Sequence, residues 1–327
     1  MSTFLIILFI LAAIFSFFNG FHDSSNIVAT IISSRAMSPR KALLLTAFSE
    51  LAGAVFFGLG GAAVAQMIGK NLVDSHAIRI ETLIAALIGA IVWSIVTWLA
   101  GIPSSSSHTL IGGLIGATWV HAGLLALEPA GMIGVLLALF LSPLIGLVIG
   151  YLFTRLVFFL ARNAHPRINF FFNRAQIFTG MALGFSHGAN DPQKPMGIMA
   201  LGMLLANYSP RFEIPWFVIL IAAGASALGT GIGGWRLIHT IGSQFYKIRP
   251  VHGFSTQVSS ALVIFGSALI GMPVSTTQVI SSALLGAGAA ERVNMVRWGV
   301  VKQIAIAWLV TIPITALISA GAAAIIK

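Results

Sequence analysis

The chain has 327 residues, of which 57% are hydrophobic and only 8% are charged, and its net charge is +10. Soluble domains carry roughly 25% charged residues, so this composition excludes a soluble enzyme or binding domain and predicts an all-α, polytopic membrane protein. The sequence contains no cysteine, which excludes disulfide bonds and thiolate metal sites.

Apolar runs recur along the whole length, and most are long enough to cross a hydrocarbon core of about 30 Å. The first run, Met1–Gly20, has no basic flank and no cleavage site, so we interpret it as a span rather than a signal peptide. The other expected spans are residues 42–68, 82–100, 131–160, 216–234, 256–271 and 303–326.

Lysine and arginine fall into clusters, and the loops between the clusters are balanced or acidic. The positive-inside rule therefore places the clusters in the cytoplasm and the loops 68–81, 121–130 and 207–215 outside. Because the basic residues act as topology signals, the net charge does not indicate nucleic-acid binding. The clusters are Arg35, Arg40 and Lys41; Arg155, Arg162, Arg167 and Arg174; Arg236, Lys247 and Arg249; and Arg292, Arg297 and Lys302.

A polar motif occurs twice in this apolar sequence, as NGFHDSSNIVAT at Asn19–Thr30 and GFSHGANDPQKPMGIM at Gly184–Met199. An ionisable residue inside a span costs about 2.5–3.5 kcal/mol to insert and therefore indicates a functional site. The segment after Asp23 leads to a basic cluster, whereas the segment after Asp191 leads to the balanced loop 207–215. The two copies therefore run in opposite directions, as in the inverted repeats of many secondary transporters.

The backbone at the two Asp motifs is expected to depart from a simple span. Pro192 and Pro195 break helical structure in the second copy. In the first copy, residues 2–34 would measure about 50 Å as one straight helix, which is too long for a single crossing. We therefore expect broken or re-entrant helices at these motifs, and the sequence does not decide between the two.

A second motif type is also duplicated, because GIPSSSSH at Gly101–His108 matches GMPVSTTQ at Gly271–Gln278. Proline disfavours helix in the preceding residue, and serine and threonine are good N-caps. Each copy therefore predicts a helix that stops inside the membrane and restarts at an N-terminus rich in hydroxyl groups, which suits an anion. The alternative is a Ser/Thr cluster that only joins helices by hydrogen bonds.

The spacing of the two motif types divides the chain into halves. The Asp motifs are 168 residues apart and the Ser/Thr motifs are 170 residues apart. This near-constant offset predicts two inverted-topology repeats, at residues 1–160 and 175–327, which meet at a site near the membrane midplane. A basic cytoplasmic loop at residues 161–174 is expected to connect them.

The acidic residues inside the apolar runs predict cation coupling. Asp23 and Asn26 are one helical turn apart, as are Asp191 and Lys194, so each pair shares a helix face. Carboxylate, amide and backbone carbonyl oxygens suit Na⁺, and a carboxylate can also carry a proton. For Asp191 the alternative is an ion pair with Lys194 that only joins helices. Glu50 has two interpretations, ion coupling or a structural hydrogen-bonded role.

Three further patterns favour ordinary structure over chemistry. The sequence around Ser186, GFSHG, fits the nucleophile elbow of serine hydrolases, but that elbow requires a preceding strand and the surrounding pattern is helical. Gly229, Gly231 and Gly234 fit a dinucleotide-binding pattern only by spacing, and we interpret them as a close helix-packing face. Five histidines are expected in surface loops: His76, His121, His165, His239 and His252.

Five segments resemble the bacterial branch of the inorganic phosphate transporter (PiT) family: NGFHDSSNIVATIISSRAM, IPSSSSHTLIGGLIGA, FSHGANDPQKPMGIMALG, GGWRLIHTIGSQFYKIRP and GMPVSTTQVISSALLGAG. The resemblance covers nearly the whole chain. It implies a symporter, not an enzyme, that imports inorganic phosphate with Na⁺ or H⁺ across the bacterial plasma membrane, the cell inner membrane, without another cofactor. The resemblance implies free phosphate or a metal–phosphate complex as the substrate, and a homodimer is compatible with the sequence.

The resemblance also implies roles for individual residues. His22 stands where many members have asparagine, which favours a proton relay at this position because histidine titrates near neutral pH. The implied cation-coupling residues are Asp23, Asn26, Glu50, Asn190 and Asp191, with Asp23 and Asp191 as the metal ligands if the cation is Na⁺. The implied phosphate-binding residues are Asp23, Asn26, Ser105, Ser106, Ser107, Asn190, Asp191, Lys194, Ser275, Thr276 and Thr277.

Proton chemistry favours phosphate over sulfate. Hydrogen phosphate keeps a P–OH group at neutral pH that can donate to Asp23 or Asp191, whereas sulfate has no proton, and a buried acceptor left unpaired costs about 1–3 kcal/mol. A sulfate or other oxyanion permease of the same fold is the main alternative, because some PiT-like proteins transport sulfate. A passive anion channel and an intramembrane serine hydrolase are remote alternatives.

Overall fold

The structure is a computed structural model that describes residues 2–165, 167–234, 246 and 248–326. These residues are almost entirely helical and contain no β-strand, which confirms the predicted all-α class. Three residues named above, Arg236, His239 and Lys247, lie outside the described residues. Five of the described helices are long and apolar enough to cross a membrane: α1 (Thr3–Ser33), α2 (Pro39–Leu59), α4 (Ile80–Ala100), α6 (Pro129–Leu160) and α13 (Trp298–Ile325).

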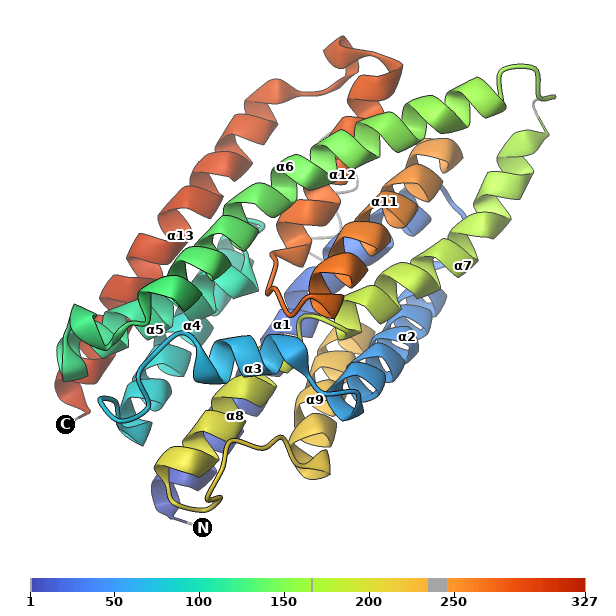
Figure 1. Cartoon of the computed structure of the whole chain (residues 1–327). Coiled ribbons are helices and arrows are strands. Elements are labelled where there is room, and N and C mark those ends of the chain that lie inside the picture. Colours follow the sequence, from blue (N-terminus) through green and yellow to red (C-terminus); the bar gives the residue numbers. More distant parts are fainter. Residues whose placement is uncertain (1, 166, 235–245, 247, 327) are drawn as a thin grey trace.

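Shorter helices complete the bundle, whose elements run along one long axis with both chain termini at the same end (Figure 1). The helix α7 begins inside the expected connecting loop, so residues 168–174 are helical. The shorter elements are α3 (Ala63–Lys70), α5 (Ser106–Ala122), α7 (Ile168–Gly188), α8 (Gln193–Leu205), α9 (Trp216–Ile232), α11 (Pro250–Leu269) and α12 (Thr276–Glu291), with 3₁₀ turns η1 (Leu124–Ala126) and η2 (Val293–Met295).

Helix α1 contradicts the expectation of a broken or re-entrant segment at the first Asp motif. It continues unbroken for 31 residues, with Asp23 in its interior. The first copy of the motif contains no proline, so no backbone hydrogen bond of the helix is lost there. The second copy does break, because α7 ends at Gly188 and α8 begins after Pro192. A helix as long as α1 fits a membrane by tilting.

The run predicted as one span at residues 42–68 is two helices, α2 and α3. In the turn between them Gly61 and Ala62 adopt positive φ angles of 116° and 46°. A right-handed helix does not continue through such angles, so the chain changes direction. Gln193 fixes the new direction, because its Oε1 accepts a hydrogen bond of 3.0 Å from the N–H of Val64 at the start of α3.

The helices α4 and α5 form a hairpin whose open end lies at the same end of the molecule as the C-terminus. Thr82 Oγ1 in the first turn of α4 lies 3.0 Å from His121 Nδ1 in the last turn of α5. His121 Nε2 lies 2.8 Å from the carbonyl oxygen of Ala323 near the end of α13. His121 is therefore part of a helix-end network, which corrects its expected place in a surface loop.

The helices α11 and α12 form a second hairpin, which is open at the opposite end, where α13 begins. Arg249 and His252 at the start of α11 both pair with Glu291 at the end of α12, and His252 Nε2 lies 2.8 Å from Glu291 Oε2. His252 is buried. Its expected place in a surface loop is therefore wrong, because the preceding Pro250 starts a helix and Glu291 supplies a partner for the ring.

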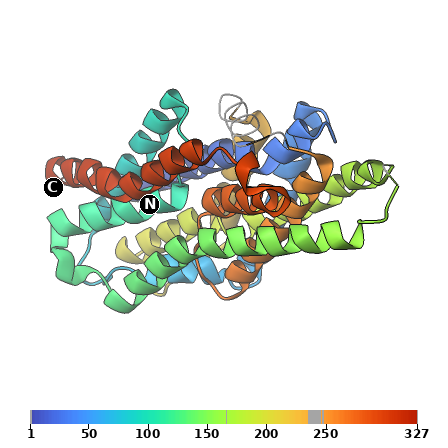
Figure 2. The same ribbon diagram turned by 90° about the horizontal axis from the view of Figure 1, so that it is seen from above.

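The first and second halves of the chain are interleaved. Helix α5 packs along α13, the last helix of the second half, and α12 packs along α6 of the first half. In the same way α1 packs against α9, and α7 packs against α2. Seen from above, α6 and α13 are the long outer helices that run along the bundle (Figure 2). Each half therefore buries much of its surface against the other.

Two glycines bring helices of different halves into backbone contact. A Cβ atom on Gly20 of α1 would lie 2.0 Å from the carbonyl oxygen of Ser226 on α9. A Cβ atom on Gly188 of α7 would lie 2.0 Å from the carbonyl oxygen of Glu50 on α2. Only glycine permits such an approach. Both glycines belong to the Asp motifs, so this packing holds each motif against a helix of the other half.

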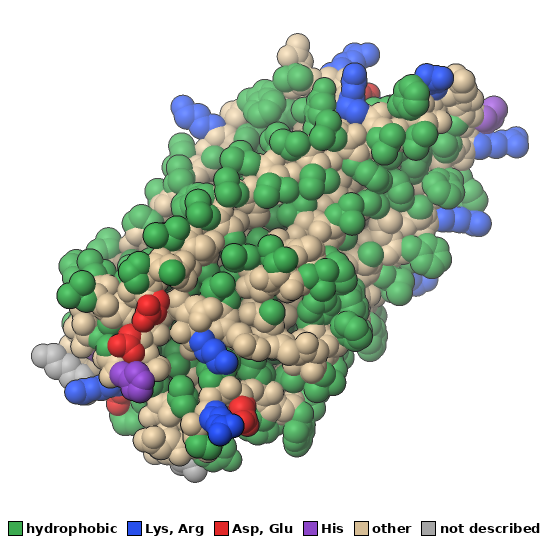
Figure 3. Space-filling view, viewed as in Figure 1, with side chains coloured by type: hydrophobic (Ala, Val, Ile, Leu, Met, Phe, Trp, Pro, Cys, Tyr) green, Lys and Arg blue, Asp and Glu red, His purple; other side chains and the backbone are tan. Residues whose placement is uncertain are grey.

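The surface has the polarity of a membrane protein. Large apolar side chains cover the middle of the molecule, most visible lysine and arginine side chains project at its upper and right-hand end, and the others lie at the lower left together with most visible acidic side chains (Figure 3). Phe48 and Leu317, for example, are 69% and 67% exposed. Such a wide apolar surface is unfavourable in water and favourable in lipid, so the chain is a membrane protein.

Candidate functional site

The two Ser/Thr motifs form the closed ends, or tips, of the two hairpins. Gly101 follows α4 with a left-handed φ of 68°, and Gly271 follows α11 with a φ of 71°, a conformation that favours glycine. Helix then restarts at the N-caps Ser105 and Ser275. Their hydroxyl oxygens accept hydrogen bonds of 3.2 and 3.4 Å from the backbone N–H groups of His108 and Gln278, respectively. The helices stop and restart as the sequence predicts.

The two tips meet in the interior. Ser275 Oγ donates a hydrogen bond of 2.8 Å to Ser105 Oγ, and Ser107 Oγ donates one of 2.8 Å to the carbonyl oxygen of Val274. All four residues are buried. The hairpins enter from opposite ends of the molecule, so the positive N-terminal ends of α5 and α12 converge on one point.

The side chain of Asn190 holds the second tip against the break between α7 and α8. Its Nδ2 donates a hydrogen bond of 3.1 Å to the carbonyl oxygen of Met272. Its Oδ1 accepts one of 3.3 Å from the N–H of Val274. The amide thus satisfies two backbone groups that the unwound tip leaves without helical partners.

The carboxylates of Asp23 and Asp191 lie side by side and in contact with hydroxyl groups of these tips. Thr276 Oγ1 is 2.6 Å from Asp191 Oδ2 and 3.1 Å from Asp23 Oδ2. Thr277 donates a hydrogen bond to Asp23 Oδ1, and Ser106 Oγ lies 3.4 Å from Asp23 Oδ2. The structure therefore brings the two Asp motifs and the two Ser/Thr motifs together, although they lie far apart in the sequence.

The negative charges of the two carboxylates are not both balanced by the hydrogen-bond donor that lies between them. Asp23 and Asp191 are both fully buried. The hydroxyl of Thr276 carries one proton and can donate to only one of them, and the shorter distance assigns that bond to Asp191. Two buried like charges at this separation repel each other, so the arrangement favours a proton or a cation at Asp23.

The ammonium group of Lys194 is held entirely by protein oxygens. It donates to Asp191 Oδ1, to Ser107 Oγ at 2.5 Å and to the carbonyl oxygen of Val274 at 2.9 Å. An ammonium has three donors, and all three are used here. A direct bond from Lys194 to an anion would therefore replace one of these contacts. The Asp191–Lys194 ion pair thus ties the second Asp motif to both tips.

His187 lies at the centre of the acidic residues. Its Nε2 is 2.9 Å from Asp191 Oδ2 and 3.5 Å from Asp23 Oδ2. Its Nδ1 is 3.3 Å from Glu50 Oε1, a contact that lacks hydrogen-bond geometry. This residue is not among those predicted for the site. A signal was present, since His187 precedes Asp191 by four residues and therefore shares its helix face.

Glu50 lies next to the Asp pair and is connected to it through His187. It is fully buried on α2, and its carboxylate accepts hydrogen bonds from Ser226 and Thr230 on α9. Every oxygen of this carboxylate thus has a hydroxyl donor. The acid that the sequence placed inside an apolar run is part of the same polar network as the duplicated motifs.

The donor set at the Asp pair fits a small cation. One ligand atom from each of Asp23, His187 and Asp191 lies within 4.8 Å of the other two. Carboxylate oxygens with the hydroxyl of Thr276 beside them are hard donors of the kind that Na⁺ takes, and a proton shared by the carboxylates is the other option.

Two predicted residues lie at the edge of the network rather than in it. Asn26 is buried, and its Oδ1 has no hydrogen-bond partner in the part of the chain that the structure describes. His22 Nδ1 lies 2.9 Å from the carbonyl oxygen of Phe18, one turn earlier on α1, and its Nε2 is likewise unpartnered among the described residues. Neither makes a hydrogen bond to the Asp pair in this state.

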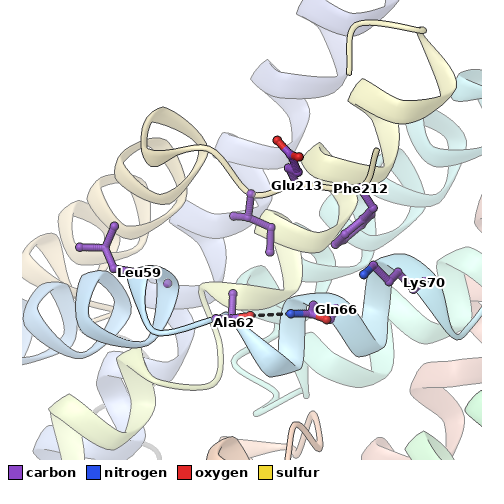
Figure 4. Close-up of a pocket in the computed structure, with 9 residues that line it drawn as sticks. Leu59, Ala62, Gln66, Lys70, Phe212 and Glu213 are labelled. Carbon is purple, nitrogen blue, oxygen red and sulfur yellow. Dashed lines mark hydrogen bonds between the residues drawn. The ribbon is translucent and has the colours of Figure 1, made fainter. Parts of the chain in front are cut away.

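A surface pocket elsewhere in the molecule is separate from this network. It lies beside the turn between α2 and α3, with Gln66, Lys70, Phe212 and Glu213 around it, and the Gln66 amide donates to the carbonyl oxygen of Gly61 (Figure 4). Its described lining shares no residue with the predicted site. The polar network between the tips is therefore the candidate functional site.

The serine hydrolase alternative lacks its structural requirement. Ser186 lies inside α7, and its Oγ donates a hydrogen bond of 2.8 Å to the carbonyl oxygen of Ala182 one turn earlier. No strand precedes it within the described range 167–234. The hydroxyl is therefore an ordinary helix side chain and not a nucleophile on a strand-to-helix turn.

Comparison with known proteins gives consistent matches. A model of the phosphate transporter family matches residues 19–169 and 161–319. The chain is 42% identical to a probable low-affinity inorganic phosphate transporter of Bacillus subtilis, over 96% of this chain and 95% of that protein. It is 40% identical to a protein of the same description from Rhizobium meliloti, over 94% and 92%. A solved structure described as the sodium-dependent phosphate transporter superposes with a TM-score of 0.88 and 27% identity, over 99% of both chains.

Proposed function

Because the chain belongs to the phosphate transporter family, we propose that it is a symporter that imports inorganic phosphate with a cation, Na⁺ or H⁺, across the bacterial plasma membrane. The chain is a transporter and not an enzyme. The observation that carries the symporter proposal is the meeting of both duplicated motif types in one buried network, where the hydroxyl-rich helix starts adjoin the two carboxylates.

In this proposal phosphate binds between the two hairpin tips. The N-terminal ends of α5 and α12 offer backbone N–H groups, hydroxyl donors and the positive ends of two helix dipoles. Lys194 adds positive charge nearby while it stays bonded to the protein, and Asp23 or Asp191 accepts the P–OH proton. The proposed donors from the tips are Ser105, Ser106, Ser107, Ser275, Thr276 and Thr277.

The coupling cation binds at the carboxylates in the same proposal. Phosphate and two acidic groups repel one another unless a positive charge lies between them. A cation at Asp23 and Asp191 removes this repulsion, so cation and phosphate favour each other's binding. Asn26 and Glu50 lie on helices α1 and α2, and Asn190 lies in the break between α7 and α8. His22 remains a proposed proton relay, although it makes no hydrogen bond to the carboxylates in this state.

Packing between helices supports two inverted repeats at residues 1–160 and 175–327. Gly20 approaches Ser226 as Gly188 approaches Glu50. In the reverse direction, a Cβ atom on Gly229 would lie 2.0 Å from the carbonyl oxygen of Phe17, and one on Gly53 would lie 2.1 Å from that of Phe185. The same contacts thus recur with the two halves exchanged, which is the pattern that repeat symmetry produces.

The distribution of charge supports an orientation for the transporter. The second hairpin opens at the end where Arg249 and Arg292 lie, and the positive-inside rule assigns that end to the cytoplasm. The first hairpin opens at the other end, near the balanced loop 68–81. Each hairpin then reaches the midplane from one side of the membrane, with the phosphate site between their tips.

Replacing Asp191 with asparagine is expected to lower the preference for phosphate over sulfate about tenfold. The asparagine amide no longer requires the P–OH proton that distinguishes the two anions, and an unpaired buried acceptor costs about 1–3 kcal/mol. Competition of sulfate with labelled phosphate in membrane vesicles measures this ratio. The matched control is Asp74→Asn in an outer loop, which should keep the wild-type ratio. An unchanged ratio in an Asp191→Asn variant that still transports contradicts this origin of selectivity.

Uptake of labelled phosphate into vesicles under imposed gradients tests the proposed function. A Na⁺ gradient and a pH gradient are applied one at a time, and the coupling cation is the one that drives accumulation against the phosphate gradient. An ionophore that dissipates that gradient should abolish accumulation. Uptake that only equilibrates phosphate under both gradients would indicate a passive channel and contradict the symporter.

A further inference from the structure

The ammonium of Lys194 is placed where a transported cation would be expected. It is surrounded by a carboxylate oxygen of Asp191, a hydroxyl of Ser107 and the backbone carbonyl of Val274. These are the oxygen ligands that a hard cation takes, and a buried ammonium of unit charge satisfies the same three groups. We name these three oxygen groups the second cation position.

The first half of the chain has the matching groups without the lysine. The motif offsets of 168 and 170 residues pair Lys194 with Asn26 and Ser107 with Thr277. Thr277 donates to a carboxylate oxygen of Asp23 directly, with no ammonium between them. Asn26 Oδ1 is buried and has no hydrogen-bond partner among the described residues. We name Asp23, Asn26 and Thr277 the first cation position.

We propose that Lys194 is a built-in cation that permanently fills the second position, so that only the first position takes a diffusible cation during transport. The inference rests on the proposed symport function. It follows from the difference between the two halves, because Lys194 bonds Asp191 directly, whereas among the described residues no lysine or arginine pairs with Asp23, and the ring of His187 lies closer to Asp191 (2.9 Å) than to Asp23 (3.5 Å). Asn26, which the motif offset pairs with Lys194, has a buried side-chain oxygen without a hydrogen-bond partner among the described residues.

This arrangement sets the stoichiometry of coupling. A tethered ammonium does not cross the membrane, so each cycle moves one cation fewer than a transporter with two open positions. The affinity of the first position for its cation alone then determines how steeply uptake depends on cation concentration. Lys194 thereby determines how many cations accompany phosphate, rather than which anion is bound.

Replacing Lys194 with asparagine, the residue of the first half, tests the inference on the purified protein. The variant leaves Asp191 without its partner and should be destabilised in choline chloride, and Na⁺ should restore several degrees of melting temperature by filling the opened position. The wild type and a matched Lys302→Asn variant, which removes an exposed lysine of α13, should lack this additional Na⁺ effect. A folded Lys194→Asn protein with no Na⁺ stabilisation beyond these two controls overturns the inference.

Transport gives a second measurement. Uptake by the wild type should depend on the concentration of the coupling cation with a Hill coefficient of about 1. If that cation is Na⁺, the coefficient for Lys194→Asn should approach about 2. If it is H⁺, Lys194→Asn should show a Na⁺ dependence in addition to the proton dependence. Unchanged cation dependence in a transporting Lys194→Asn variant overturns the inference. If neither gradient drives uptake by the wild type, the proposed function fails, whereas the Na⁺ effect on melting temperature still decides the role of Lys194.

The converse substitution keeps the inference testable if Lys194→Asn does not fold. Asn26→Lys should place a second tethered ammonium beside Asp23 and fill the first position. Phosphate binding to this variant, measured by equilibrium binding of labelled phosphate, should become independent of Na⁺ and of pH near neutrality. Binding by Asn26→Lys that keeps the wild-type cation dependence overturns the inference.

Discussion

Asp23→Asn is expected to reduce cation-driven phosphate uptake at least about 100-fold. Asp23 accepts a hydrogen bond from Thr277 and carries the charge that the coupling cation requires. Interactions with a charged group contribute about 1.5–3 kcal/mol each and each 1.4 kcal/mol is tenfold, so removing the charge of Asp23 weakens both its bond to Thr277 and its attraction for the cation by about 3 kcal/mol in total.

The initial rate of labelled phosphate uptake, normalised to the amount of folded protein in the vesicles, measures this effect. The Asp74→Asn variant makes the same chemical change in an outer loop and should transport like the wild type. Retention of near-wild-type, gradient-driven uptake by Asp23→Asn would show that the carboxylate of α1 does not take part in coupling.

Gly188→Ala is expected to destabilise the protein by more than about 3 kcal/mol and to lower its melting temperature by about 10 °C. The new methyl group would lie 2.0 Å from the carbonyl oxygen of Glu50, so α7 and α2 would have to separate. That separation would also move His187 and Asp191 away from Glu50, because all three lie close to this contact.

Thermal unfolding of detergent-purified protein, followed by the loss of the monodisperse peak in size-exclusion chromatography, measures the stability. Gly134→Ala on α6 is the matched control, since no atom lies within 4 Å of a Cβ atom added there. Equal melting temperatures for Gly188→Ala and Gly134→Ala would mean that the close contact of α7 with α2 contributes nothing to stability.

Helix ends and restarts were predictable where they depend on residues that are close together in the sequence. Glycine, proline and adjacent hydroxyl residues define the restarts at Ser105 and Ser275, and each residue acts on its own backbone. The course of α1 was not predicted correctly, because residues 2–34 were expected to be too long for a single crossing, whereas α1 stays unbroken and a long helix fits a membrane by tilting. The hairpins depend on contacts between residues distant in sequence, such as Thr82 with His121, which local patterns do not specify.

The site was predictable in its composition but not in its contacts. The duplicated motifs identified Asp23 and Asp191 as partners because an inverted repeat brings equivalent residues together. The contacts of His187 with the carboxylates were missed, although its spacing of four residues from Asp191 indicates a shared helix face. The spacing of Asp191 and Lys194 indicated their ion pair, but the bonds of Lys194 to Ser107 and Val274 depend on how the tips fold around it and emerged only from the structure.

The interleaving of the halves has a consequence for biogenesis. Helix α5 packs along α13, which begins only at Trp298 and is therefore synthesised much later than α5. The first hairpin therefore cannot complete its packing before α13 is synthesised. Until α13 is inserted, the polar tip of this hairpin remains in the translocon or among lipids. A nascent chain that terminates before α13 would expose this hairpin, which makes it a recognisable substrate for membrane quality-control proteases.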